Sequence, residues 1–374
     1  MNTLDKILIL GSLTNFSGSS LRNWEIANGL SKLGYQVTYS EPIDRNKKNK
    51  PLFPSIEYLP SPYFNLPFFL GFIPSFFYNS KLLLNNNFDV IITAKPFPHS
   101  SIPVIFFGKN SIKILDIDDL EYEYHKGVIK HLVKFITEFS IKIFPYFSTH
   151  NQPLKKFLIN KFLLHSNKIF FLGQGINIKT FKNRNILKIK KLTKKLNIKK
   201  DDIVILFSAH LGPASSLSTI LKSLTKIKTS NKFKLLVVGG GSYLSKYRNE
   251  CKELNLLDKV IFIGQVDFNN RANYFHLADF AVNYNIDSGN EFRSPMKLRE
   301  YLASKLPVIT SDIGDTKIFS KYIKLIKNET ELTNCFQKWI NNPPSPNIAG
   351  QKFVIDNYSW STICKKFITQ IKKI

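Results

Sequence analysis

The chain has 374 residues, of which 43% are hydrophobic, and its formal net charge is +26. This length and composition predict a globular protein with two domains of ordinary size. Its three cysteines, Cys251, Cys335 and Cys364, are too few and too scattered for a disulfide framework and form no C-x-x-C pair. We therefore expect neither structural disulfides nor a zinc site, and a cytoplasmic location.

The positive charge comes mainly from lysine, in a chain that is also rich in asparagine, isoleucine and phenylalanine. An AT-rich coding sequence produces this bias without any functional pressure. Proteins that read nucleic acids rely on arginine forks interleaved with aromatic side chains. No such module is recognisable, so we expect no nucleic-acid partner.

No segment has the pattern of an export signal or of a membrane span. The first residues lack the basic start and the small-residue cleavage site of a signal peptide. The longest apolar run, residues 65–77, is interrupted by Pro67, Gly71 and Pro74 and is too short to cross a bilayer. We expect no transmembrane helix.

Strand-like and helical segments alternate through the first half of the chain. A helix is expected at residues 21–34, and strands are expected at 6–12, 35–42, 89–96, 111–119 and 168–176. A strand, a helix and a strand in this order are typical of the start of a Rossmann-like parallel sheet. The lysine-rich segment 177–202 shows no core periodicity, and we interpret it as a linker.

Residues 126–147 combine lysines with aromatic side chains, namely Lys126, Lys130, Lys134 and Lys142 with Phe135, Phe139, Phe144 and Phe147. An amphipathic helix packed on the core explains this pattern. Reversible contact with an anionic membrane surface, at the inner face of the membrane, is the alternative explanation.

A second alternating series follows the expected linker. Strands are expected at residues 203–212, 234–242, 259–266, 279–285 and 307–312, with helical segments between them. The chain ends in an amphipathic helix, in which Trp360, Ile363, Phe367 and Ile371 recur at helical spacing. Two doubly wound α/β halves would bind a ligand at the carboxyl ends of their strands.

The stretch SPMKLREYLASKLPVITSD, residues 294–312, predicts a helix that runs directly into a buried strand. Ser294 is a candidate N-cap and Pro295 suits the first turn. Lys297 and Glu300 lie one turn apart, near the positively polarised start of the helix. They form either a surface ion pair or part of a site for an anion.

The order of these segments resembles the GT-B glycosyltransferases of the large retaining family 4. FLGQGINIKTF (171–181) resembles the family's PNGVDxxxF segment, and SPMKLREYLASKLPVITSDIGD resembles its glutamate helix followed by A-x-G-x-PV. The segment VIFIGQVDFNNRANYFHLADFAVN and the closing YSW helix resemble further parts of the family. The resemblance implies two Rossmann-like domains facing across a crevice, at residues 1–182 and 183–355, and a helix at 356–374 that crosses back to the first domain.

The resemblance also implies a site for a nucleotide-sugar donor. Glu300 stands at the position of the glutamate that accepts hydrogen bonds from the ribose. The phosphates would lie near the helix start and the preceding loop, and the candidate residues for binding them are Lys297, Arg293, Ser294, Gly289, His210 and Gly264. The family's first glutamate would fall at Phe292, so neighbouring Glu291 is the candidate contact to the donor sugar. His210 and Ser215 replace the arginine and lysine with which the family grips the diphosphate.

Residues 116–121, DIDDLE, contain the D-x-D pattern with which a different fold, GT-A, binds a metal. In a GT-B protein this strand end faces the crevice instead, and Asp118 and Asp119 are candidates for orienting an acceptor hydroxyl. Carboxylates that cap the next helix are the alternative. Gly11 and Gly18 flank the first strand-to-helix turn, on the acceptor side. We expect no bound metal.

The chain is therefore expected to be a retaining glycosyltransferase that moves a sugar from a UDP- or GDP-sugar to a glycan or a lipid-linked glycan. No tightly bound cofactor is expected, and the setting would be the synthesis of a cell-surface polysaccharide or glycoconjugate. A catalytically silent sugar-nucleotide or glycan-binding protein is the alternative outside the enzymes. A nucleotide-sugar epimerase of the same fold would need base-like residues, and no convincing set of them is found.

Overall fold

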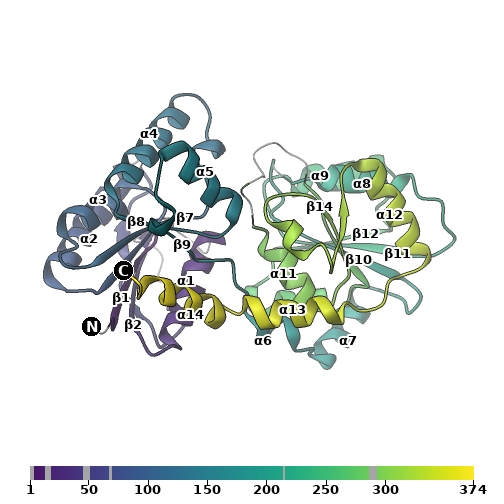
Figure 1. Ribbon diagram of the computed structural model, residues 1–374. Coiled ribbons are helices and arrows are strands. Elements are labelled where there is room, and N and C mark those ends of the chain that lie inside the picture. The colour runs from purple at the N-terminus through teal and green to yellow at the C-terminus, as the bar shows by residue number, and fades with distance from the viewer. Residues whose placement is uncertain are drawn as a thin grey trace. The chain divides into compact units, whose positions relative to one another are not determined.

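The computed structural model describes residues 4–12, 18–44, 51–66, 70–213, 215–285, 292 and 294–374. The chain folds into two compact units (Figure 1). The first contains residues 1–175 and 360–374, and the second contains residues 176–359. The C-terminal residues thus return to the first unit, as the sequence predicts.

The first unit is built on a parallel sheet with the strand order β4-β2-β1-β6-β7-β8-β9. Its strands are β1 (Lys6–Leu10), β2 (Gln36–Ser40), β4 (Glu57–Tyr58), β6 (Val90–Ala94), β7 (Ile112–Ile117), β8 (Tyr146–Thr149) and β9 (Ile169–Phe171). A small separate sheet pairs β3 (Pro42–Asp44) with β5 (Ser61–Tyr63). The order of the main sheet reverses between β1 and β6, and in such sheets the point of reversal is where ligands bind.

Helices cover the first sheet on both faces. They are α1 (Gly18–Ser31), α2 (Ile73–Asn85), α3 (Pro98–Phe107), α4 (Gly127–Ile143), α5 (Gln152–Phe162) and α14 (Trp360–Ile371). Right-handed crossovers place α1 on one face and α3 and α4 on the other. α14 packs against α1 (Figure 1), and a Cβ atom added at Gly29 would lie 2.7 Å from Cys364 Sγ. This close approach explains the glycine.

The helix α4 accounts for the lysine-rich segment 126–147. Val133, Thr137, Ser140 and Ile141 of α4 are buried against the core, so the prediction of a core-packed amphipathic helix is confirmed. Phe144 and Phe147 are also buried, whereas Phe135 and Phe139 are exposed. Only part of the predicted aromatic face is therefore available for a membrane surface. In the described part of the chain, no helix combines the length and the hydropathy needed to cross a bilayer.

The second unit is also built on a parallel sheet, with the order β12-β11-β10-β13-β14-β15. Its strands are β10 (Ile203–Ser208), β11 (Phe233–Val238), β12 (Val260–Gly264), β13 (Phe280–Asn283), β14 (Val308–Ser311) and β15 (Lys324–Ile326). Alternate residues of β10 belong to different core clusters, Ile205 and Phe207 to one and Val204 and Leu206 to the other. The sheet is therefore buried on both faces, as is typical of a doubly wound domain.

Helices pack on both faces of the second sheet. They are α8 (Leu217–Thr225), α9 (Leu244–Glu253), α10 (Phe268–Phe275), α11 (Met296–Ala303), α12 (Glu329–Asn341) and α13 (Ile348–Tyr358). The order of the sheet reverses between β10 and β13. The carboxyl ends of these two strands are therefore the expected ligand position of this unit.

The interpretation of residues 177–202 as a linker without core contacts is wrong. The segment contains α6 (Ile178–Lys182) and α7 (Ile186–Lys195), which begin after the capping residues Asn177 and Asn185. Phe181 of α6 is fully buried in the core of the second unit. In α7, Ile186, Ile189 and Leu192 recur at helical spacing, although no residue of the helix is fully buried, so the pattern was present in the lysine-rich sequence and was missed.

Candidate functional site

The helix α11 carries the predicted signature glutamate. It begins at Met296 with Pro295 in the N-cap position and no side-chain cap, so the prediction that Ser294 caps it is wrong. The Ser294 hydroxyl instead donates a hydrogen bond to Asp315 Oδ2 at 2.6 Å, and Arg299 Nη2 donates to the same oxygen at 2.8 Å. A buried carboxylate needs such donors, and together they fix the start of α11 to the segment after β14.

Glu300 lies on the buried side of α11, with 1% of its surface exposed. Its Oε1 accepts a hydrogen bond from the Arg271 guanidinium on α10. Among the described residues, no group donates to its Oε2. Burial raises the pKa of Glu300, and the positive charges of Arg271 and Lys297 oppose this shift. The carboxylate is thus held by one oxygen, and the other can accept a hydrogen bond.

A surface ion pair with Lys297, one of the two alternatives for Glu300, is not the main contact of this carboxylate. Arg271 is its direct partner, while Lys297 acts on it through its charge. Sequence reasoning missed Arg271, because it lies 29 residues before Glu300 on another helix. No local spacing signals such a pair.

The residue that follows Glu300 ties α11 to the end of the central strand. Tyr301 Oη accepts a hydrogen bond from the backbone N–H of Ser208, the last residue of β10, at 2.9 Å. The backbone N–H of Asn285 after β13 donates to Ser311 Oγ at 2.8 Å. The first contact brings α11 to the carboxyl end of β10, next to β13, where the sheet order reverses. The second joins the segment after β13 to the end of β14.

His210 is exposed on the loop that follows β10. The same loop explains two glycines of the segment 239–242, because Cβ atoms at Gly239 and Gly241 would collide with the carbonyl oxygens of Ala209 and Leu211. These glycines therefore permit close approach of two loops. Gly264 ends β12 with φ 81, a left-handed conformation that favours glycine.

Three predicted site residues, Gly289, Glu291 and Arg293, lie outside the described residues. Lys305 stands where the family pattern A-x-G-x-PV has its glycine. It adopts φ 63 just after α11, so the backbone takes the conformation that a glycine would favour even though a lysine is present.

In the first unit, Asp116 of the D-x-D pattern is occupied by protein contacts. It forms a buried ion pair with Arg22 and accepts a hydrogen bond from Ser148 Oγ at 2.7 Å. Arg22 Nη2 also donates to the backbone oxygen of Leu172 at 2.9 Å. Asp116 thus connects α1, β7, β8 and the segment after β9, which is a structural role.

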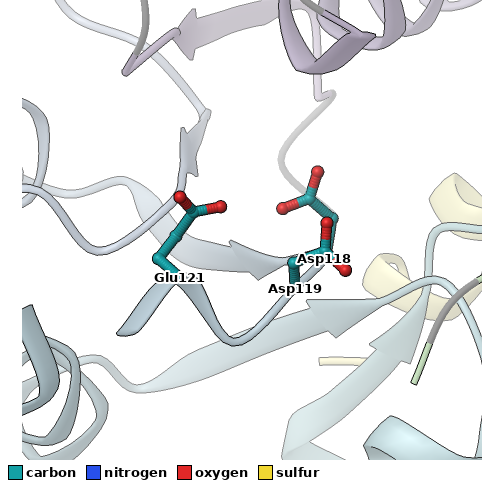
Figure 2. A group of neighbouring side chains, drawn as sticks. All are labelled: Asp118, Asp119 and Glu121. Atoms are coloured by element: carbon teal, nitrogen blue, oxygen red, sulfur yellow. The ribbon is translucent and has the colours of Figure 1, made fainter. Parts of the chain in front are cut away.

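Asp118, Asp119 and Glu121 lie together on the segment after β7 (Figure 2). Lys95 Nζ forms an ion pair with Glu121 and lies 3.7 Å from Asp118 Oδ1. Burial alone would raise the pKa of Asp118, but the charges of Lys95 and Arg22 outweigh it and lower that pKa. Asp118 is therefore ionised at neutral pH, and Lys95 balances one negative charge of the cluster.

The predicted acceptor-side glycines lie at the turn between β1 and α1. A Cβ atom at Gly11 would lie 2.9 Å from both Glu41 Cβ and Tyr39 Oη. Gly11 is therefore required by the packing of buried Glu41, which accepts hydrogen bonds from Ser20 and Tyr39, each at 2.7 Å. Gly18 is the first residue of α1.

Comparison with known proteins agrees with this architecture. Residues 188–352 match the family described as Glycosyl transferases group 1. The chain is 28% identical over 138 residues to the alpha-monoglucosyldiacylglycerol synthase of Streptococcus pneumoniae, and the match covers 36% of this chain and 30% of that protein. It is 23% identical over 243 residues to an uncharacterised glycosyltransferase of Methanocaldococcus jannaschii, with 60% of this chain and 59% of the relative covered. The chain thus spans less than two thirds of these curated relatives.

Solved structures match over almost the whole chain. Sucrose-phosphate synthase from Thermosynechococcus elongatus superimposes with a TM-score of 0.80 at 15% identity, over 99% of this chain and 98% of that one. HepE from Anabaena, in complex with UDP and glucose, superimposes with a TM-score of 0.80 at 14% identity, over 99% of this chain and 100% of that one. These matches confirm the predicted GT-B fold.

Proposed function

We propose that this chain is a nucleotide-sugar-dependent glycosyltransferase, because residues 188–352 match the family Glycosyl transferases group 1 and the chain has a GT-B fold. It transfers a sugar from a UDP- or GDP-sugar to a glycan or lipid-linked acceptor, with retention of configuration. The family match supports the activity, and the geometry of this chain supports the roles of its residues.

The observation that best supports the proposal is the hydrogen bonding of the two carboxylate oxygens of Glu300. Its carboxylate is buried, fixed by Arg271 through Oε1, and has no hydrogen-bond donor on Oε2 within the described residues. A buried carboxylate oxygen without a donor is costly. A ribose diol supplies donors of the required kind, so the unfilled oxygen is explained if a nucleoside binds there.

The start of α11 supplies the next contact. Lys297 lies in its first turn, and the N–H groups of a helix start favour an anion. We assign the diphosphate of the donor to this position, with Lys297 as a neighbouring positive charge. HepE is described in complex with UDP-glucose, which makes a UDP-sugar the first donor to test.

Asp118 and Asp119 are proposed to orient an acceptor hydroxyl at the carboxyl end of β7. The ionised Asp118 beside Lys95 provides both an acceptor and a donor of hydrogen bonds. The relative from Streptococcus pneumoniae is named as a synthase of a glucosyl diacylglycerol, and this favours a lipid-linked acceptor at a membrane surface.

A peripheral contact with an anionic membrane is part of the proposal. On α4 the apolar side chains of Val128, Leu132, Phe135 and Phe139 are exposed. The lysines of the helix lie among them, although Lys130 and Lys134 also pair with Glu123 and Glu138. An exposed face of this kind suits reversible adsorption to lipid.

A thermal-shift screen against UDP, GDP, TDP and their sugars tests donor binding, because a ligand that binds only the folded state raises the unfolding temperature. Release of free sugar or of glycoside from the responding donor then tests catalysis. An absence of any nucleotide response would contradict the proposal.

A catalytically silent binder is the second candidate. It is favoured by His210 and Ser215, which replace the arginine and lysine expected to grip the diphosphate. Developing charge on a leaving diphosphate needs strong donors or cations. A donor that binds tightly but is neither hydrolysed nor transferred under any acceptor condition would identify this function instead.

A further inference from the structure

The first unit contains an apolar pocket of about 260 Å³ between the starts of α2 and α3. It is lined by Phe72, Ile73, Phe76, Phe77, Pro98 and His99. All of these side chains are apolar except His99. The pocket is smaller than the ~300–1,000 Å³ of sites that enclose whole drug-sized ligands, so it suits one part of a larger molecule.

His99 presents an uncharged ring to this pocket. It stacks on Phe72, with ring centroids 4.4 Å apart and an angle of 13° between the planes. Neither ring nitrogen makes a hydrogen bond of normal geometry within the described part of the chain. Burial lowers the pKa of His99 to about 3, and the backbone of Ser12 opposes this shift. The pocket therefore carries no charge at neutral pH.

The pocket lies at the reversal point of the first sheet. His99 belongs to the start of α3, directly after β6, and the neighbouring Ser12 follows β1. β1 and β6 are the two strands between which the sheet order reverses. Ligands of doubly wound sheets bind at this position, so the pocket is placed where a substrate group is expected.

A single short segment joins the pocket to the polar group of the proposed acceptor site. Lys95, at the end of β6, adopts φ 66, and its ammonium group pairs with Glu121 near Asp118. Four residues later His99 lines the pocket. An amphiphilic molecule could thus have its polar end beside Lys95 and Asp118 and its apolar end in the pocket.

The rim of the pocket is exposed to solvent. Ile73 and Phe77 on α2 are 48% and 65% exposed, and both line the pocket. Two large apolar side chains at a concave site gain from contact with another apolar group. A nucleobase has several polar groups on its edges and would meet only the His99 ring as a polar side chain here, whereas a hydrocarbon chain needs no polar partner.

We infer that this pocket binds the hydrocarbon chain of the acceptor, while its head group lies at the polar edge formed by Lys95 and Asp118. This inference rests on the proposed function and specifies its acceptor as a molecule with an apolar tail. A straight acyl chain and a branched isoprenoid chain share the required chemistry.

The test measures binding of n-alkyl β-D-glucosides of increasing chain length to the full chain, by calorimetry below their micellar concentrations. The affinity is expected to rise roughly fourfold per added methylene and then to level off once the pocket is filled. Geranyl glucoside, compared with n-octyl glucoside, distinguishes an isoprenoid preference from an acyl preference.

Two substitutions at the rim, Ile73→Asp and Phe77→Asp, are expected to abolish the dependence on chain length. Leu84→Asp is the matched control, because Leu84 is 57% exposed on the same helix and does not line the pocket. Phe135→Asp, at a position 67% exposed on α4, controls for adsorption to the lysine-rich face. Both controls are expected to keep the wild-type dependence.

The inference is overturned if affinity does not change with chain length, or if the control variants lose the dependence as fully as the rim variants. The thermal response to nucleotide is measured on the same proteins. A nucleotide response without dependence on chain length refutes the pocket alone, and dependence on chain length without any nucleotide response refutes the proposed transferase.

Discussion

Replacement of Glu300 by glutamine is the most direct perturbation of the proposed donor site. The two side chains are nearly equal in size, so the packing around this buried position is retained. The change removes the negative charge and converts one acceptor oxygen to an NH₂ donor. We expect weaker binding of the nucleotide that responds in the screen.

The size of the effect follows from the arrangement of the two oxygens. Arg271 donates to Oε1, so a glutamine would keep its carbonyl oxygen toward Arg271 and present its NH₂ group where Oε2 now lies. A ribose hydroxyl would then meet a donor instead of a charged acceptor. Hydrogen bonds to charged groups contribute about 1.5–3 kcal/mol, which corresponds to a roughly 10- to 150-fold weaker affinity.

The effect on folding should be much smaller. Burial raises the pKa of Glu300, which shows that the buried charge is itself costly, and loss of this cost offsets the weakened contact with Arg271. Arg271 also keeps 21% of its side chain exposed to solvent, which limits the penalty of losing a charged partner. The unfolding temperature should therefore stay near that of the wild type.

The assay is isothermal calorimetry with the responding nucleotide, combined with thermal unfolding of the same samples. Asp279→Asn is the control, because Asp279 precedes β13 at the opposite, amino edge of the sheet, where it accepts a hydrogen bond from the Val204 N–H at 2.7 Å. An affinity of Glu300→Gln within twofold of the wild type, or an equal loss in Asp279→Asn, would refute the assignment of Glu300 to the ribose.

Four further outcomes are expected. Burial lowers the pKa of His99 from 6.5 to about 3 in the folded protein. The free energy of unfolding should therefore fall as the pH drops below 6.5, by about 3 kcal/mol at pH 4.5. Denaturant unfolding of His99→Phe should lack this part of the pH dependence. Donor hydrolysis or transfer should continue in EDTA, since helix N–H groups and lysines meet the diphosphate charge; complete loss that manganese restores would point to a metal site. The wild type should float with anionic liposomes at low salt but not at high salt. A variant with the four lysines of 126–142 changed to glutamine should not float at either salt concentration, because each lysine contributes about 1 kcal/mol near such a surface. Lys305→Gly should raise the free energy of unfolding by about 1 kcal/mol by removing a side chain from a left-handed backbone position, and a lower unfolding midpoint would contradict this.

The sequence by itself determined the two α/β units and most of their central strands. Strands buried on both faces of a parallel sheet are continuous apolar runs, which are local signals. Thus β10, β13 and β14 lie within segments that the sequence marks as strands, and the closing helix α14 shows its buried face by its spacing. The segment with Glu300 was identifiable because helix, proline and strand follow one another directly.

The tertiary structure alone decided which side chains meet. Arg271 reaches Glu300 across 29 residues, and Arg22 reaches Asp116 across 94 residues. Neither pair has a spacing that repeats along a helix or strand. The same is true of Ser294, which suits a helix cap by its position but instead donates to Asp315, 21 residues later.

The apolar pocket of the first unit is likewise formed only by the tertiary structure. Its lining comes from the start of α2 and the start of α3, which are separate along the chain, and in the sequence its phenylalanines are indistinguishable from core residues. A hydrophobic pattern in the sequence indicates which side chains avoid water. The packing of the helices and strands decides whether such a side chain fills the core or lines a cavity.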